Sequence, residues 1–253
     1  MDTIDSSVDV VLLTKNSQRC LKECLDSVYQ NVPVHELIVI DGYSTDETLP
    51  ILNNFNEQYH NVKIFYDKGN RATARQKGIG LVTTEWFIFV DSDVILCRDW
   101  YKKAQACINE NVGAVWGTEV WSTIETASTL KLFLLVTRKI FEVRGGTHDT
   151  LIRTSTVRDI RIPKKLHVFE DGYIKDWIES KGFQVVACYV PFCLHYRPQN
   201  VWTVTGSLDL IAEAFKFGHP RIIIKLLAAY GFYTAYAVYQ FTNNGQTSNR
   251  KLG

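Results

Sequence analysis

Short apolar runs alternate with helix-like segments along the first 90 residues, and this alternation limits the chain to few folds. The apolar runs at residues 8–13, 35–40, 62–65 and 85–90 have the length of buried strands. Residues 19–29 and 72–81 carry apolar side chains at helical spacing, and residues 45–48 have the capping oxygen and early acids of a helix start. Strand–helix alternation at this spacing predicts an α/β fold with a mostly parallel, doubly wound sheet and helices on both faces.

Size, charge and cysteine usage exclude several classes of protein. The chain has 253 residues, 46% of them apolar, which suits one large domain and excludes disorder or a disulfide-stabilised miniprotein. A net charge of +1 argues against a general nucleic-acid-binding protein. The acidic N-terminus lacks the basic region of a signal peptide. Six cysteines without metal-binding spacing are interpreted as reduced thiols of a cytosolic protein, and a Cys188–Cys193 pairing is left open.

Polar residues follow three of the four predicted strands. Thr14 and Asn16 follow the first strand, Asp41 the second, and the Asp91-Ser92-Asp93 run the fourth. Ligands of such sheets bind outside the carboxyl ends of the strands, so we expect these clusters to converge on one edge. Asp41 is interpreted either as a ribose or base contact or as an Asx-turn residue.

Asp91 and Asp93 are candidates for binding a cation. Side chains two residues apart in extended backbone point the same way, so both carboxylates can face one ion. Oxygen ligands suit Mg²⁺ or Mn²⁺, which is commonly held by one or two carboxylates and substrate phosphates. A turn with capping acids before residues 98–109 is the alternative, and the position after a buried strand favours the metal.

Charged side chains near two predicted helix starts add further candidates. Lys68 precedes the 72–81 helix, and Arg75 lies near its start. Their basic side chains, with the backbone N–H groups of the helix start, either face a bound anion or form part of a solvated helix surface. Glu170 and Asp171 begin a helix pattern that runs to about residue 181. These acids either complement the helix dipole or supply a general base. His195 follows the strand-like stretch 185–194. Its role is left open, and it is either a hydrogen-bonding residue or a ligand of the metal.

A series of segments, taken in their order along the chain, resembles the inverting family-2 glycosyltransferases with the GT-A fold, of the dolichyl-phosphate or lipid-linked-glycan type. The segments are VVLLTKN, VIDGYSTDET, KGNRATARQKGI, FVDSD, RGG with LIR, FEDGYIKDWIESKGF and VPFCLH. Each is degenerate alone, but the series is specific, and it covers about residues 8–197. The resemblance implies a GT-A Rossmann-like glycosyltransferase domain over residues 1–197, with a mostly parallel central sheet flanked by helices.

The resemblance implies roles for the matching positions. The residues expected to bind the nucleotide-sugar donor are Thr14, Asn16, Asp41, Lys68, Arg75, Asp91 and Ser92. A divalent cation, Mn²⁺ or Mg²⁺, is expected on Asp93, Asp91 and His195. The acceptor side is expected at Gly145, Gly146 and Thr147, and the catalytic residues at Asp171 and Glu170. Tyr43 stands where the family pattern has a serine, so base or ribose contacts are expected to differ there.

The implied reaction is inverting, metal-dependent transfer of a hexose from GDP-mannose or a UDP-hexose to a hydroxyl of a glycan or lipid-linked acceptor. Asp171 would be the general base. A polyprenyl (dolichyl) phosphate acceptor would need no base, because its oxygen is already largely ionised. A sugar-1-phosphate nucleotidyltransferase would need a Gly-rich loop after the first strand, and residues 14–19 contain no glycine. The intact acids at positions 91, 93 and 171 disfavour a non-catalytic scaffold.

The C-terminal segment, residues 198–253, is predicted to be a helical membrane-associating appendage. Residues 222–241 contain one charge, Lys225, and are about long enough to span a bilayer. Several tyrosines within this run and basic residues before it favour an interface. We expect association through residues 205–241 with the cytoplasmic face of a membrane, peripherally or by a single C-terminal anchor. A soluble cytoplasmic protein with a core-covering or dimerising helix is the alternative.

Overall fold

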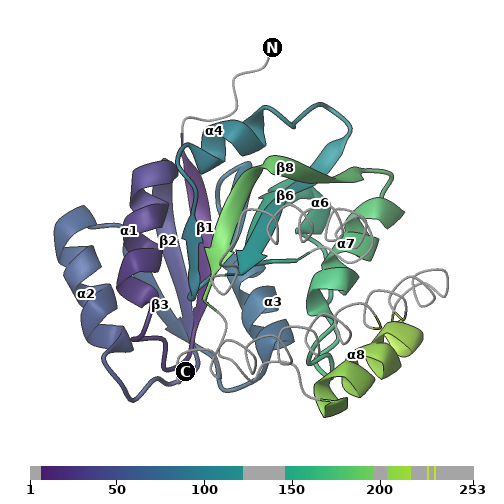
Figure 1. Ribbon diagram of the computed structural model, residues 1–253, viewed down its shortest axis with the longest axis horizontal. Helices are drawn as coiled ribbons and strands as arrows, with labels where there is room; N and C mark the ends of the chain where they lie inside the picture. Colours follow the sequence, from purple (N-terminus) through teal and green to yellow (C-terminus); the bar gives the residue numbers. More distant parts are fainter. Residues whose placement is uncertain (1–6, 122–145, 197–203, 218–226, 228–230, 232–253) are drawn as a thin grey trace, which may run out of the picture.

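The computed structural model describes residues 7–121, 146–196, 204–217, 227 and 231. Strands and helices alternate through its first half as the sequence predicts (Figure 1). These elements are β1 (Val8–Thr14), α1 (Leu21–Asn31), β2 (Val34–Asp41), α2 (Thr48–Tyr59), β3 (Val62–Tyr66), α3 (Arg71–Leu81) and β4 (Trp86–Asp91). The later elements are β5 (Val94–Leu96), α4 (Trp100–Gln105), β6 (Val112–Trp121), β7 (Asp149–Arg153), α6 (Thr154–Val157), α7 (Glu170–Ser180), β8 (Gln184–His195) and α8 (Val204–Phe217).

One sheet of eight strands, in the order β3-β2-β1-β4-β7-β6-β8-β5, organises the described residues. The first four strands in this order are parallel, which confirms the expected doubly wound half. The rest is mixed, because β7 runs antiparallel to both β4 and β6, and β5 runs antiparallel to β8. The sheet is thus mixed with a parallel majority of pairings, which agrees with the predicted mostly parallel sheet. The sequence did not indicate which strands are antiparallel, since strand direction depends on the connections and not on local hydrophobicity.

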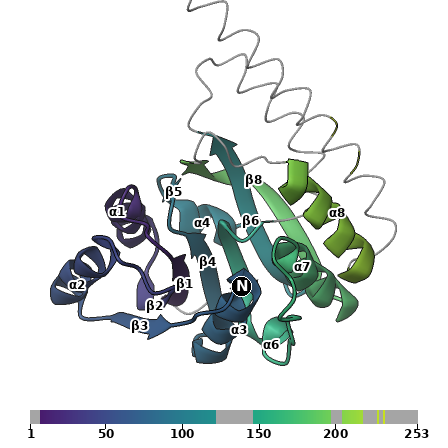
Figure 2. The ribbon, with the colours of Figure 1, turned by 90° about the horizontal axis from the view of Figure 1, so that it is seen from below.

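Helices cover both faces of this sheet, and Figure 2 shows the strands between α1 on one side and α7 on the other. Alternate side chains of β1 divide between the two faces: Val10 and Leu12 pack with α1, α2 and α4, whereas Val11 packs with α3 and α7. Gly78 permits the close packing of α3 on β1, because a Cβ there would lie 2.4 Å from Val11 Cγ1. The core thus holds the strands rigidly and leaves their carboxyl ends available for a site.

The cysteines differ from the expectation of six reduced thiols. Cys107 and Cys188 form a disulfide, whereas Cys20, Cys24, Cys97 and Cys193 are free. The Cys188–Cys193 pairing that the sequence left open is therefore not formed. Cys107 and Cys188 are 81 residues apart in the sequence, so no local cysteine spacing predicted this disulfide.

The helix α8 packs against the body of the protein. Ala214 is buried in the core beside α3 and α7, and the Glu213 carboxylate accepts hydrogen bonds from backbone N–H groups of residues 167–169. The division into a domain over residues 1–197 and an appendage over 198–253 stays a prediction. Across the ranges described, no helix combines the length and apolarity needed to cross a membrane. Apart from Leu227 and Gly231, the 222–241 run lies outside the described residues.

Candidate functional site

The carboxyl ends of β1, β2, β3 and β4 meet at one edge of the sheet. In parallel register, Thr14 lies beside Asp41, and Leu13 lies beside Asp91. Asp41 in turn lies beside Tyr66 at the end of β3. The polar clusters that the sequence placed at three strand ends are therefore brought together.

Asp41 is fully buried and connects the first two strand ends. Its carboxylate accepts hydrogen bonds from Thr14 Oγ1 at 2.8 Å, from the Ser44 backbone N–H at 2.8 Å and from Ser44 Oγ at 2.6 Å. Asn16, whose φ is 50°, accepts a hydrogen bond from the Thr45 backbone N–H at 2.9 Å. Thr14, Asn16 and Asp41 thus shape the two loops at this edge, and their contact with a nucleoside stays a prediction.

Arg75 on α3 links the end of β4 to the start of α7. Its guanidinium is buried, donates from Nη2 to Asp91 Oδ1 at 3.2 Å, and lies with Nε 3.5 Å from Glu170 Oε1. Arg75 Nη1 and Glu170 Oε2 are buried and have no hydrogen-bond partner among the described residues. Because a buried polar atom without a partner is costly, these two atoms are candidates for a hydrogen bond with a polar ligand.

The clustered charges shift the ionisation of Asp91 and its neighbours. Burial raises the pKa of Asp91, but the cationic Arg75 and then His195 outweigh burial and lower this pKa to about 2. Burial raises the pKa of the Glu170 carboxyl above its ordinary value. Burial alone would lower the pKa of Arg75, yet Asp91 and Glu170 raise it. Asp91 is therefore an anion, and Arg75 a cation, at neutral pH.

A candidate cation site consists of Asp91, Asp93 and His195. One ligand atom from each residue lies within 4.8 Å of the others, and His195 Nε2 is 3.1 Å from Asp93 Oδ1. The pairing of β5 with β8 creates this arrangement by setting Val94 opposite His195. Two carboxylates and one imidazole fit a divalent cation, and the imidazole favours Mn²⁺ over Mg²⁺. The site thus fits the metal-binding role predicted for these three residues, which stays a prediction.

Glu119 on β6 is a site residue that the sequence analysis missed. Its Oε1 lies 2.9 Å from His195 Nδ1, and its Oε2 lies 3.5 Å from His148 Nε2. His148 Nδ1 lies 2.6 Å from Asp149 Oδ1, and Asp149 Oδ2 accepts a hydrogen bond from Trp100 Nε1. Two features of the sequence could have indicated these residues. Glu119 is the single acid in the otherwise mostly apolar stretch 112–121, and His148 and Asp149 form a polar pair at the start of β7.

Two further residues predicted on the donor side lie near the loops of this edge. Lys68 is exposed, and its Nζ lies 5.0 Å from the centroid of the Tyr43 ring. Ser92 Oγ shares a hydrogen bond of 2.8 Å with Ser17 Oγ. Ser92 therefore joins the β4 end to the loop after β1, and Lys68 stands beside the loop after β2.

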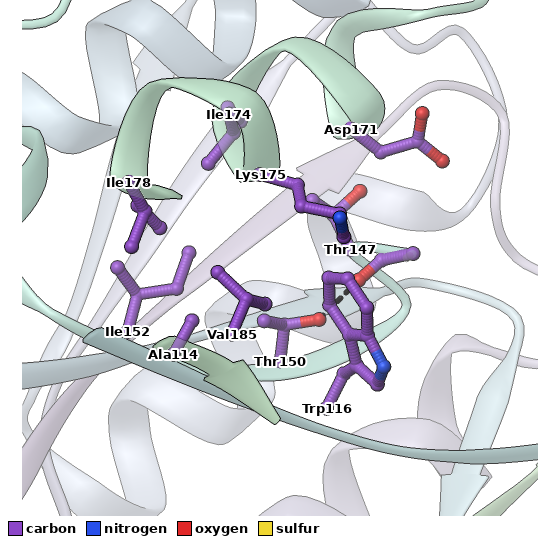
Figure 3. Close-up of a pocket in the computed structure, with 11 residues that line it drawn as sticks. Ala114, Trp116, Thr147, Thr150, Ile152, Asp171, Ile174, Lys175, Ile178 and Val185 are labelled. Carbon is purple, nitrogen blue, oxygen red and sulfur yellow. Dashed lines mark hydrogen bonds between the residues drawn. The ribbon is translucent and has the colours of Figure 1, made fainter. Parts of the chain in front are cut away.

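Asp171 in the first turn of α7 lines a pocket between this helix and the sheet (Figure 3). Its Oδ1 accepts a hydrogen bond from the Gly172 backbone N–H at 2.7 Å, and the side chain is partly exposed. The pocket is lined by Ala114, Trp116, Gly146, Thr147, Thr150, Ile152, Asp171, Ile174, Lys175, Ile178 and Val185. Gly146 and Thr147, predicted on the acceptor side, thus lie with Asp171, whereas Gly145 lies outside the described residues.

Comparisons of the sequence with known proteins point to one family. The family described as Glycosyl transferase family 2 matches residues 9–155. The poly(ribitol-phosphate) beta-glucosyltransferase of Bacillus spizizenii is 36% identical over 257 residues, which cover 88% of this chain and 39% of the relative. An uncharacterized glycosyltransferase of Haemophilus influenzae is 31% identical over 102 residues, which cover 38% of this chain and 40% of the relative. The chain thus spans about two fifths of the length of these curated relatives.

Solved structures share the fold. The mannosyltransferase PcManGT from Pyrobaculum calidifontis, in complex with GDP-Man and Mn²⁺, matches with a TM-score of 0.65 at 16% identity, covering 98% of this chain and 84% of that chain. TarS 1-349 from S. aureus, in complex with UDP-GlcNAc, matches with a TM-score of 0.63 at 19% identity, covering 87% of this chain and 71% of that chain. At such identities the likeness shows the fold alone, an α/β fold of the GT-A type.

Proposed function

The chain belongs to glycosyl transferase family 2, and we propose that it transfers a hexose from a nucleotide-diphospho-sugar to a hydroxyl group of a glycan or glycopolymer, with inversion at C1 of the sugar. The observation that carries this proposal is the contact of Arg75 with both Asp91 and Glu170. Through this contact the candidate cation site and the start of α7, with Asp171, share one edge of the sheet.

The diphosphate of the donor is proposed to lie between the candidate cation site and Arg75. Arg75 Nη1 has no hydrogen-bond partner within the described part of the chain and can donate to a phosphate oxygen. A divalent cation, when bound, neutralises the charge that develops on the leaving diphosphate. The complexes of similar structures with GDP-Man and UDP-GlcNAc support a GDP- or UDP-linked hexose as donor.

Asp171 is proposed as the general base. As the acceptor oxygen bonds to C1, its proton passes to the Asp171 carboxylate, and the bond from C1 to the diphosphate oxygen breaks. Support comes from the partly exposed position of Asp171 in the pocket that Gly146 and Thr147 also line. Glu170 faces Arg75 and is proposed to position that guanidinium.

A hydroxyl of a polymer is the acceptor class with the most support. The Bacillus spizizenii relative carries poly(ribitol-phosphate) in its name, and it aligns with most of this chain. The relatives and structures compared above do not support the narrower assignment to the dolichyl-phosphate type. We therefore propose a polyol or sugar hydroxyl on a polymeric acceptor.

We propose that residues 205–241 associate with a membrane. Among the described side chains of α8, Leu208 is 59% and Phe215 is 63% exposed, and Lys216 follows them. Exposed apolar residues beside a basic one suit the surface of an anionic bilayer. Co-sedimentation of the full chain with anionic and with neutral vesicles tests this point.

The proposal is tested by donor binding followed by turnover. We expect GDP or UDP with Mn²⁺ to raise the free energy of unfolding, by about 2.7 kcal/mol at 100 times the dissociation constant. Sugar release from GDP-mannose, UDP-glucose and UDP-GlcNAc then identifies the donor. Asp93→Asn should lose the Mn²⁺-dependent part of the stabilisation, whereas the exposed Asp99→Asn should keep it. Stabilisation by neither nucleotide, together with turnover of no donor, would contradict the proposal.

A further inference from the structure

A second group of candidate metal ligands lies beside the candidate cation site and is buried. It consists of His148, Asp149 and Cys193, which are at most 5% exposed. One ligand atom of each residue lies within 4.8 Å of the others. His148 Nδ1 lies 2.6 Å from Asp149 Oδ1 and 3.8 Å from Cys193 Sγ. The His148 ring centroid is 6.0 Å from that of His195, so the two groups are neighbours.

The sheet brings these ligands together from strands that are neighbours only in the folded chain. In the order β7-β6-β8, the strand β7 begins at Asp149 and β8 carries Cys193, with β6 between them. Cys193 pairs in register with Glu119 of β6. A Cβ at Gly117 of β6 would lie 2.1 Å from Asp149 Oδ2, so this glycine leaves the space that the carboxylate occupies. An ion bound by this group would cross-link β7 to β8.

Two of the three ligands are themselves held by further side chains. Trp100 Nε1 donates a hydrogen bond of 2.9 Å to Asp149 Oδ2, and Asp149 Oδ1 is directed at His148. Glu119 Oε2 lies 3.5 Å from His148 Nε2, the ring nitrogen that faces away from Cys193. Histidines that bind a metal are typically oriented in this way, by a carboxylate at their second nitrogen. The group thus has the outer contacts of a metal site as well as its donor atoms.

We infer that His148, Asp149 and Cys193 bind a Zn²⁺ ion, separate from the ion of the candidate cation site. A thiolate, an imidazole and a carboxylate are ligand types of Zn²⁺, whereas Mg²⁺ and Mn²⁺ prefer oxygen ligands. The bond lengths of tetrahedral Zn²⁺ require nitrogen and sulfur about 3.6 Å apart, close to the 3.8 Å between His148 Nδ1 and Cys193 Sγ. His148 Nδ1 and Asp149 Oδ1 must separate by about 0.8 Å, as the ion replaces the hydrogen bond between them.

Charge balance suits such an ion in the interior. The Cys193 thiol loses its proton on binding, and the thiolate and the Asp149 carboxylate then neutralise the two charges of Zn²⁺. A water completes the tetrahedron. Cys193 lies two residues before His195 on the same strand, so the ion would also fix the part of β8 that carries a residue of the candidate cation site. The inferred role is therefore structural, and it does not depend on the donor or the acceptor.

Co²⁺ tests this site, because it occupies Zn²⁺ sites and a thiolate bound to it gives a charge-transfer absorption band in the near ultraviolet. The full chain, stripped of metal by a chelator, is titrated with Co²⁺ under anaerobic conditions. We expect a band that saturates at one ion per chain and disappears when Zn²⁺ is added. Cys193→Ser should lose the band, whereas Cys97→Ser, at another buried free cysteine, should keep it. Asp93→Asn, in the candidate cation site, should also keep it.

Three results would overturn the inference: a folded wild-type chain without the band at saturating Co²⁺, a band that Cys193→Ser retains, or a band that Asp93→Asn loses. Asp149→Asn serves if Cys193→Ser does not fold, because it nearly preserves the shape of the side chain. Competition with a chromophoric chelator should show Zn²⁺ affinity at least about tenfold lower in Asp149→Asn, and unchanged affinity would contradict the site. None of these readouts involves a nucleotide, so they are independent of the proposed function.

Discussion

The carboxylate of Glu119 lies 2.9 Å from Nδ1 of His195 and fixes which nitrogen of that imidazole faces the candidate cation site. With Nδ1 beside Glu119, Nε2 is directed toward Asp93, from whose Oδ1 it lies 3.1 Å. The second oxygen of Glu119 lies 3.5 Å from His148, so the carboxylate is itself held in place. Carboxylates that hold a ligating histidine in this way tune the affinity of a metal site.

We expect Glu119→Gln to lower Mn²⁺ affinity about 10–100-fold, because the amide holds the His195 ring less firmly and no longer supports its basicity. Electron paramagnetic resonance of free Mn²⁺ measures this affinity without any substrate. Glu110→Gln, at an exposed acid near the start of β6, is the control. Unchanged Mn²⁺ affinity in Glu119→Gln, together with a clear loss in His195→Ala, would contradict the positioning role.

Local sequence patterns predicted the half of the fold that carries the strand-end edge with Thr14, Asp41 and Asp91. Apolar runs and the polar residues after them located the ends of β1, β2 and β4, because period and length are properties of each segment alone. The contact of Glu119 with His195 depends instead on the pairing of β6 with β8, which sets Trp121 opposite His195. No local pattern contains that information. Arg75 and Glu170 were each predicted as site residues, but their contact depends on how α3 and α7 pack on one face of the sheet.

The direction and the neighbours of β7 likewise could not be predicted from local sequence. The structure forms β7 over Asp149–Arg153, which includes the LIR run of the resemblance. Its place between β4 and β6, and its reversed direction, depend on the connection from β6. Strand direction and neighbour order are properties of the chain path, so the expected mostly parallel sheet is confirmed, whereas the positions of its antiparallel strands could not be predicted.

Acid should weaken the fold through Asp9, a fully buried residue of β1. Burial raises its pKa, but hydrogen bonds from the backbone N–H of Thr83, from His35 and from the backbone N–H of Thr84 lower it below the ordinary value of 3.8. Because the pKa is lower in the folded than in the unfolded state, the ionised Asp9 stabilises the fold fully above about pH 4. This contribution is lost as the pH falls through the lowered pKa.

We therefore expect Asp9→Asn to cost about 2 kcal/mol of unfolding free energy at pH 7 and progressively less as the pH is lowered toward about 3. Urea unfolding of the wild type and the variant across this range measures the difference. Asp26→Asn, at an acid of α1 paired with Lys22 on the surface, should show little change. A constant difference between wild type and Asp9→Asn at all pH values would contradict the prediction.

Removal of the Glu213 carboxylate should loosen the start of α7. This side chain accepts hydrogen bonds from the backbone N–H groups of His167, Val168 and Phe169, at 2.8, 2.9 and 3.1 Å. These three residues precede Glu170 and Asp171, so α8 holds the segment that leads to the proposed general base. Hydrogen bonds to a charged acceptor contribute about 1.5–3 kcal/mol, so we expect Glu213→Ala to lower the unfolding free energy by about 2 kcal/mol.

Hydrogen exchange gives the local readout for this variant. The amides of residues 167–173 should exchange faster in Glu213→Ala, while those of β1 and β2 stay protected. Asp209→Ala, at an exposed acid one helical turn earlier on α8, is the matched control. Equal exchange at residues 167–173 in both variants would show that α8 does not order this segment.

Replacement of Asp171 distinguishes the two classes of acceptor. With a hydroxyl acceptor, Asp171→Asn removes the group that takes the proton, and we expect kcat to fall about 10²–10⁴-fold with nucleotide affinity unchanged. With a polyprenyl phosphate acceptor the attacking oxygen is already ionised, so the same variant should keep most of its activity. Measuring transfer to a poly(ribitol phosphate) and to a polyprenyl phosphate, with Asp99→Asn as a surface control, separates the two. Nearly full transfer to the hydroxyl acceptor by Asp171→Asn would exclude Asp171 as the base, because the asparagine amide cannot accept the proton in its place.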